Sequence, residues 1–234
     1  MSDKDFSILI IDDSKTSRKK LFNSLFEEGY TLGMASNGKE GLEKAITQNY
    51  DLILLDIEMP LVRGDEVLKK LKKNSKLSII PVIVISSIDH LRMVYKCLHL
   101  GADDYLPKNF DPSLLKAKIS SLLEKKKLRE KERSFIQYMQ HELEIAARIQ
   151  KFLIPKEAPL YNDLQFHFFY QPMESVGGDF FDFICSSEKY TGIFISDVEG
   201  HGLPAAFITS MIKAVVDGLK PNLLSPGQFL AEVN

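Results

Sequence analysis

The residues best suited to chemistry in the first half of the sequence stand where short apolar runs end. The segments IIDDS, ILLDIEMP, VIVISS and DDYLPK supply them, and the set is Asp12, Asp13, Asp56, Ser86 and Lys108. Three carboxylates brought together repel one another unless a cation binds them, and hard oxygen donors favour Mg²⁺. An aspartate beside Mg²⁺, flanked by a lysine and a hydroxyl, is suited to capturing a phosphoryl group. The carboxylate acts as the nucleophile, while Mg²⁺ and Lys108 neutralise the developing charge.

Five apolar runs must bring these side chains together. They are Phe6–Ile11, Tyr30–Ala35, Leu52–Asp56, Val82–Ser86 and Asp104–Leu106. Helical patterns such as Arg18–Glu28 and Gly64–Lys73 separate these runs. Two helix starts can also be read from the sequence. Asn37 to Glu40 is typical of a capping box, and Asp111-Pro112 opens the last helix. Strands alternating with helices predict an α/β fold with a parallel sheet covered on both faces. Ligands bind such sheets at the carboxyl ends of the strands, where the charged residues stand.

Residues 5–123 resemble the receiver domain of two-component response regulators, on the motifs quoted above. The resemblance implies a (βα)5 flavodoxin-like domain over residues 1–123. It implies that Asp56 accepts phosphate from a histidine kinase. It also implies that Asp12 or Asp13, Asp56 and the Glu58 backbone carbonyl hold Mg²⁺.

The same resemblance assigns roles around the phosphoryl group. Ser86 and Tyr105 are the implied switch pair, and Lys108 is implied to contact the phosphoryl oxygens. The sequence departs from the family at the loop after the fifth strand. Asn109 follows the lysine where the family usually has proline, and Pro107 precedes it, which leaves the geometry of that loop open.

A helical linker is predicted over residues 124–155. The segment EKKKLREKER at 124–133 lacks an apolar face and predicts a solvated, continuous helix. Beyond it, steps of three and four join Ile136, Met139, Leu143, Ala146, Gln150 and Leu153. This spacing favours a coiled-coil seam and a homodimer through 134–154. A helix that packs on its own chain is the alternative, and Pro155 and Pro159 end it in either case.

The pattern becomes β-rich after the linker. Gln165–Tyr170, Asp179–Cys185 and Tyr190–Asp197 are typical of strands, and a helix is expected from about Pro204 to Leu219. If the hairpin turns near Glu188, Asp179 lies opposite Asp197, Phe181 opposite Ile195 and Phe183 opposite Ile193. Two opposed carboxylates destabilise a sheet unless divalent cations bridge them, so a metal site is predicted. A register slip of one residue would separate the carboxylates onto opposite faces.

Three segments resemble the SpoIIE/RsbU-type branch of the metal-dependent protein phosphatases, the PPM family. They are ELEIAARIQKFLIP at 142–155, QPMESVGGDFFDF at 171–183 and ISDVEGHGLPAAF at 195–207. The resemblance implies an α+β β-sandwich, begun by residues 156–234. It implies Asp179, Asp197 and the Val198 carbonyl as ligands of Mn²⁺ or Mg²⁺, and phosphoserine or phosphothreonine proteins as substrates. Because the sequence stops at Asn234, about midway through that fold, we expect this chain to be weakly active or inactive.

Composition narrows the classes of partner. The net charge of −2 gives no basic field for nucleic acid, no apolar stretch is long enough to cross a membrane, and the two cysteines match no metal spacing. A cytoplasmic protein is expected. The first hypothesis is a response regulator that controls phosphatase action on an anti-sigma-factor antagonist. The alternatives are a non-catalytic module that docks a sigma factor or antagonist, and a dimerisation unit in which 156–234 is a remnant.

Overall fold

The computed structural model describes residues 6–60, 62–87, 90–160, 165–172, 175–187, 190–219 and 225–234. The chain divides into two compact units, Met1–Glu132 and Arg133–Asn234. Helix α5 (Pro112–Leu153) contributes residues to both of them. Each unit has its own sheet and its own buried core, so each is described by itself.

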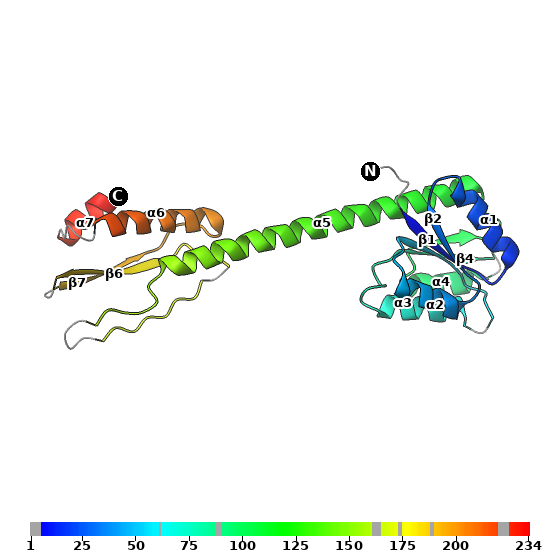
Figure 1. Cartoon of the computed structure of the whole chain (residues 1–234), viewed down its shortest axis with the longest axis horizontal. Helices are drawn as coiled ribbons and strands as arrows, with labels where there is room; N and C mark the ends of the chain where they lie inside the picture. The colour runs from blue at the N-terminus through cyan, green and yellow to red at the C-terminus, as the bar shows by residue number, and fades with distance from the viewer. Residues whose placement is uncertain are drawn as a thin grey trace. The chain divides into compact units, whose positions relative to one another are not determined.

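The N-terminal unit is built on a five-stranded sheet (Figure 1). Its strands are β1 (Ser7–Ile11), β2 (Thr31–Ala35), β3 (Leu52–Asp56), β4 (Val82–Ser86) and β5 (Asp104–Pro107). All neighbours pair in parallel, in the order β2-β1-β3-β4-β5. The predicted α/β fold with a parallel sheet is confirmed, and every predicted run became a strand with ends shifted by no more than one residue.

Helices cover both faces of this sheet. They are α1 (Lys15–Phe26), α2 (Gly38–Thr47), α3 (Gly64–Lys73), α4 (Leu91–His99) and the first part of α5. Successive strand residues point to opposite faces. Accordingly, Leu9 and Ile11 join a core with Leu68 of α3, whereas Ile8 and Ile10 join another core that includes residues of α1 and α5. Burial on both faces explains why β1, β3 and β4 are nearly continuous apolar runs.

Two predicted helix starts can be compared with the structure. Asp111 precedes the first residue of α5, Pro112, and its Oδ1 accepts a hydrogen bond from the Ser113 amide at 2.7 Å, as the sequence predicts. Asn37 caps α2 by accepting from the Glu40 amide at 2.9 Å. The return bond of the expected capping box is different, because Glu40 accepts from the amide of Ser36 instead of Asn37.

The C-terminal unit contains an antiparallel hairpin and two helices. The hairpin joins β6 (Phe180–Ser187) to β7 (Tyr190–Ser196), and the helices are α6 (Leu203–Leu219) and α7 (Pro226–Val233). Phe181 pairs with Ile195 and Phe183 with Ile193, which confirms the predicted register. The predicted turn at Glu188 lies outside the described residues. Phe180, Ile184 and Phe194 pack with Val216 and Phe229 on one face of the hairpin.

The predicted strand at Gln165–Tyr170 is wrong. The structure gives this segment no regular secondary structure. Its alternate aromatic rings nevertheless contact the hairpin: Phe166 lies 5.7 Å from Phe183, and Phe168 lies 4.9 Å from Phe181, between ring centroids. The alternating apolar residues here pack on a sheet face, but the segment forms no hydrogen-bonded ladder. The same sequence pattern is expected for a true strand and for an extended segment that only packs on a sheet.

A helix is predicted over 124–155, and residues 124–153 form the second part of α5, which ends two residues earlier than predicted. Along the predicted seam, Ile136 is 49% exposed whereas Gln150 is 5% exposed. Gln150 is covered by its own chain, so at this position the helix packs as the alternative interpretation expects. Dimerisation through the earlier seam residues stays a prediction. Within the described part of the chain, the helices are too short or too polar to cross a membrane.

Candidate functional site

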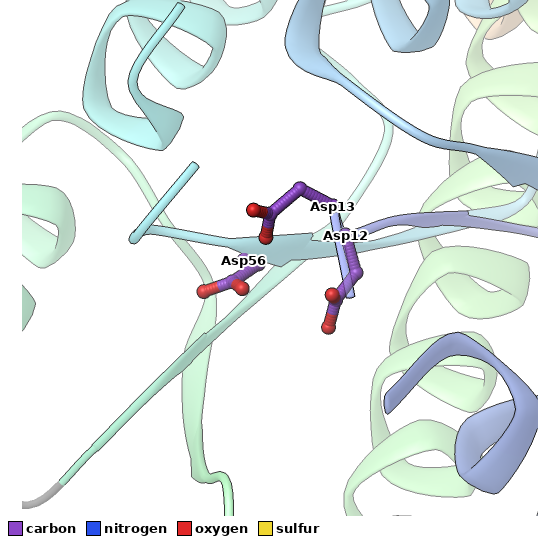
Figure 2. Close-up of side chains that lie close together, drawn as sticks. All are labelled: Asp12, Asp13 and Asp56. Atoms are coloured by element: carbon purple, nitrogen blue, oxygen red, sulfur yellow. The ribbon is translucent and has the colours of Figure 1, made fainter. Parts of the chain in front are cut away.

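Three carboxylates converge at the carboxyl edge of the N-terminal sheet. Asp12 and Asp13 directly follow β1, and Asp56 is the last residue of the neighbouring strand β3. One oxygen from each lies within 4.8 Å of the others, and Figure 2 shows the three side chains at adjoining strand ends. Among the described residues, no other group of three or more carboxylate, histidine or cysteine side chains is arranged to hold a metal.

The two aspartates after β1 have different environments. Asp12 is fully buried, and its carboxylate accepts hydrogen bonds from the Ser14 amide at 2.7 Å and from the Ser17 hydroxyl. Ser14 and Ser17 belong to the start of α1, which therefore sets the orientation of Asp12. Asp13 is exposed. The buried carboxylate is thus fixed by the fold, while its neighbour faces solvent and is free to meet an incoming cation.

Asp56 has two carboxylate oxygens with different surroundings. It is fully buried, and its Oδ1 accepts from the Glu58 amide at 3.0 Å. Its Oδ2 lies 3.0 Å from Lys108 Nζ, but no donor is aligned to form a hydrogen bond with this oxygen. Burial raises the pKa of Asp56, against the opposing effects of the Glu58 amide and Lys108. One carboxylate oxygen therefore keeps its lone pairs available beside a positive charge.

Lys108 bridges the carboxylates of Asp56 and Glu58. Its Nζ lies 3.0 Å from Asp56 Oδ2 and 3.0 Å from Glu58 Oε2. Burial acts against the charged ammonium, but the attraction of the Asp56 and Glu58 carboxylates outweighs it and raises the pKa of Lys108. The lysine therefore stays protonated and can neutralise negative charge on an oxygen between these groups.

The loop after β5 reaches this position without a cis peptide bond, because the described residues contain none. Pro107 ends β5 opposite Ser86, and the Lys108 amide donates to the Ser86 carbonyl at 2.9 Å. The proline before the lysine thus serves as the last strand residue. The sequence leaves the geometry of this loop open, because Asn109 stands where the family usually has proline. In the structure, the hydrogen bond between the Lys108 amide and the Ser86 carbonyl holds the lysine beside Asp56.

The Glu58 side chain was not expected to take part in the site. Its Oε1 accepts from the hydroxyls of Ser86 at 3.2 Å and Ser87 at 2.8 Å. Burial by itself would raise the pKa of Glu58, but hydrogen bonds from Ser87 and Lys108 lower it to about 2. Glu58 thus binds Lys108 and Ser86, the lysine and the serine that are expected to contact a phosphoryl group. An acidic residue two positions after Asp56 is the sequence feature that could have indicated this.

The expected switch residues flank the site on β4 and β5. Ser86 is fully buried at the end of β4. Tyr105 is half-buried and packs against the core that contains Val94 and Cys97 of α4. Their coupled movement stays a prediction, since it requires two states of the domain.

Replacing Glu58 with glutamine is expected to strengthen binding of beryllofluoride, a phosphoryl analogue, by about threefold to tenfold. The substitution removes one negative charge that competes for Lys108, an interaction worth about 1 kcal/mol at a partly exposed site. Isothermal titration in the presence of Mg²⁺ measures the affinity. Glu66→Gln, on an exposed position of α3, is the matched control. Unchanged or weaker binding by the Glu58 variant would contradict the competition.

The second predicted site lies at the open end of the β6–β7 hairpin. Asp179 directly precedes β6 and Asp197 directly follows β7, one step beyond the Phe180–Ser196 pair. Both carboxylates are exposed and line one hollow of about 430 Å³ together with the aromatic rings of β6. The ladder register, continued by one residue, brings them to the same face.

The third predicted ligand, the Val198 carbonyl, lies against a glycine. A Cβ on Gly178 would come within 2.5 Å of the Val198 oxygen, so only glycine fits this approach. The Val198 amide in turn donates to the Gly178 carbonyl at 3.3 Å. The carboxylates of Asp179 and Asp197 are hard oxygen donors, the ligand type that suits Mg²⁺ or Mn²⁺.

Two family comparisons match different parts of the chain. Residues 8–120 match the family described as the response regulator receiver domain. Residues 187–234 match the family described as stage II sporulation protein E (SpoIIE). The first match contains all five residues singled out at the sheet edge, together with Glu58 and Tyr105. The second contains Asp197 and Val198, whereas Asp179 precedes it.

Individual relatives match the N-terminal unit. The chain is 38% identical over 116 residues to the transcriptional regulatory protein PcoR of Escherichia coli, covering 50% of each chain. It is 34% identical over 121 residues to the alkaline phosphatase synthesis transcriptional regulatory protein PhoP of Bacillus subtilis, covering 52% of this chain and 50% of that one. The chain therefore spans about half the length of these curated relatives.

Solved structures agree with this part of the fold. A response regulator receiver domain protein (CheY-like) from Methanospirillum hungatei is 30% identical, with a TM-score of 0.50. The similarity covers 53% of this chain and 98% of that one.

Proposed function

Because residues 8–120 belong to the response regulator receiver domain family, we propose that the chain takes a phosphoryl group from a histidine kinase onto Asp56 and thereby controls a metal-dependent protein phosphatase output. The observation that carries the first half is the Oδ2 atom of Asp56. It is buried, has no aligned hydrogen-bond donor and lies 3.0 Å from Lys108 Nζ. A carboxylate oxygen in this state is a nucleophile with a cation already beside it.

The phosphoryl step follows from these positions. A lone pair of the Asp56 carboxylate attacks phosphorus, the phosphorus–nitrogen bond of the kinase phosphohistidine breaks, and the electron pair leaves with the imidazole. Lys108 neutralises charge on the transferred oxygens once Glu58 releases it, and the Ser86 hydroxyl becomes free to donate to them. Mg²⁺, for which Asp12, Asp13, Asp56 and the Glu58 carbonyl are the proposed ligands, supplies further charge neutralisation when bound.

The proposed output is hydrolysis of phosphoserine or phosphothreonine on a protein. The SpoIIE match over 187–234 and the placement of Asp179 and Asp197 at one hairpin end support it. The proposed substrate is an anti-sigma-factor antagonist, which follows from the resemblance of this half to SpoIIE/RsbU-type phosphatases. Mn²⁺ or Mg²⁺ is the proposed metal.

A specific observation favours a second candidate function, a docking module without catalysis. Among the described residues, no third metal-binding side chain joins Asp179 and Asp197, and both carboxylates are exposed. Two-metal hydrolysis needs a pair of metal ions that stabilises both the attacking and the leaving oxygen, and two side-chain carboxylates are few ligands for such a pair. The two functions differ in whether Mn²⁺ binds at the hairpin end and whether phosphate is released.

Replacing Asp197 with asparagine is expected to weaken Mn²⁺ binding to the C-terminal unit at least tenfold, because a charged ligand of a hard cation is lost. Electron paramagnetic resonance of free Mn²⁺ measures the binding, and phosphate release from a phosphoserine protein, with and without beryllofluoride, measures the activity. Glu199→Gln, an exposed carboxylate two residues away, is the control. Equal Mn²⁺ binding by wild type and the Asp197 variant would leave the docking module as the better function.

A further inference from the structure

Gln150 is a buried polar residue near the end of α5. Its hydrogen-bond partners are distant from it in the sequence. Its side chain is 5% exposed. Its Nε2 donates to the Gly177 carbonyl at 2.6 Å, and its Oε1 accepts from the Gly177 amide at 3.0 Å. The Nε2 group also donates to the Thr209 hydroxyl of α6 at 3.3 Å. The primary amide thus satisfies both backbone groups of one glycine, as a β-ladder partner would.

Gly177 begins the short loop that delivers Asp179 to the hairpin end. The next residue, Gly178, accepts from the Val198 amide at 3.3 Å, and the Asp179 carbonyl accepts from the Tyr170 hydroxyl at 3.3 Å. Each residue of the loop is therefore held by a different element: α5 holds Gly177, the segment after β7 holds Gly178, and Tyr170 holds Asp179. The hydrogen bonds between the Gln150 side chain and Gly177 therefore attach this loop to α5.

The contact is unusual for a coiled-coil position. Gln150 follows Ala146 by four residues in the predicted seam, where a side chain would face a partner helix. Here it is enclosed by the loop and by Thr209, which is itself 1% exposed and donates to the Ala206 carbonyl at 2.8 Å. A buried amide with all of its partners inside one chain is costly to move, because any displacement leaves polar groups unpaired.

We propose that Gln150 is a positioning residue that fixes the Gly177–Asp179 loop to α5, so that metal binding by Asp179 depends on the placement of this helix. The proposal rests on the proposed phosphatase function and adds a regulatory contact to the same site. Helix α5 also carries Leu115, Ile119 and Leu123, which are buried in the core of the N-terminal unit. One continuous helix therefore joins that core to the loop that presents Asp179.

The test replaces Gln150 with methionine, which has the same length and a good helix propensity but cannot make these hydrogen bonds. Gln140→Met, at an exposed position of the same helix, is the matched control. Amide hydrogen exchange of Gly177, followed by NMR in the full chain, is expected to become about tenfold faster in the Gln150 variant. Mn²⁺ affinity is expected to fall about tenfold, the lower end of the loss seen when a residue that orients a metal ligand is removed.

A second variant separates positioning from folding. Thr209→Val removes one acceptor of Gln150 but leaves both bonds to Gly177, so Mn²⁺ affinity should stay within about twofold of wild type even where stability falls. Protection of the β6 and β7 amides reports whether the unit is folded. Fast Gly177 exchange and weak Mn²⁺ binding in a folded Gln150 variant support the proposal. Wild-type Mn²⁺ affinity in that variant overturns it while leaving the phosphatase function intact.

The two proposals fail in different ways. If the wild-type chain binds no Mn²⁺ at the hairpin end, the proposed phosphatase site fails, and with it the proposed effect of Gln150 on metal binding. The amide hydrogen-exchange rate of Gly177 then still tests whether Gln150 attaches the Gly177–Asp179 loop to α5. A rate that is unchanged by Gln150→Met overturns the attachment of the loop to α5, and an increase restricted to residues 177–179 supports it.

Discussion

Replacing Asp56 with asparagine is expected to abolish phosphorylation of the chain. The amide is almost the same size as the carboxylate, but it is not a nucleophile toward phosphorus. Asp56 is fully buried beside Lys108, and no other carboxylate of the described site has an oxygen so placed without an aligned donor. Intact-mass spectrometry after incubation with acetyl phosphate and Mg²⁺ should show phosphorylated wild type and no phosphorylated variant.

The control is the same substitution at another position. Asp111→Asn should leave phosphorylation unchanged, because asparagine caps a helix as well as aspartate does. A phosphorylated Asp56 variant would mean that the acceptor is elsewhere, with Asp13 the next carboxylate to replace.

The same variant has an expected effect on stability. Burial raises the pKa of Asp56, so the folded state binds its proton more tightly than the unfolded state does. Ionisation of Asp56 therefore costs stability as pH rises above the pKa of the unfolded state. Without divalent cations, the asparagine variant should be at least as stable as wild type at neutral pH and lose this advantage in acid. Urea unfolding at several pH values measures the difference and shows that lost phosphorylation is not lost folding.

Replacing Gly64 with alanine is expected to destabilise the N-terminal unit by about 3 kcal/mol. A Cβ at this position would lie 2.3 Å from the Asp56 carbonyl oxygen and 2.6 Å from Ile57 Cα. Both contacts are with backbone, so no side-chain rotation relieves them. The reason is space and not backbone conformation, since φ at Gly64 is not positive. Movement of the Asp56–Ile57 backbone should also slow phosphorylation.

Gly218 provides a contrasting substitution. It lies near the end of α6, and a Cβ there would meet nothing within 4 Å. Gly218→Ala should therefore stabilise its own unit by up to about 1 kcal/mol, the helix-propensity gain. Urea unfolding followed through resolved NMR amide signals of each unit measures both effects. A Gly64 variant with wild-type stability would show that the close approach of α3 to the end of β3 is not required.

Local patterns in the sequence determined most of the fold. Apolar runs such as Leu52–Asp56 and Val82–Ser86 became buried parallel strands because burial on both faces requires unbroken apolar residues. Since parallel strands end at one edge, the placement of Asp56 and Lys108 at the same site also followed from the sequence. The pairing of Phe181 with Ile195 followed because two alternating strands and a short connection permit few registers.

The choice of hydrogen-bond partners was decided only by the tertiary structure. Glu58 binds Ser86, 28 residues away, and Gln150 binds Gly177, 27 residues away. Gln150 continues a heptad pattern, and that pattern is the same whether the helix meets another copy or its own chain. The segment Gln165–Tyr170 likewise has the alternation of a strand but packs without a ladder. Apolar periodicity shows which side of an element is buried, whereas its partner depends on which surfaces the folded chain brings together.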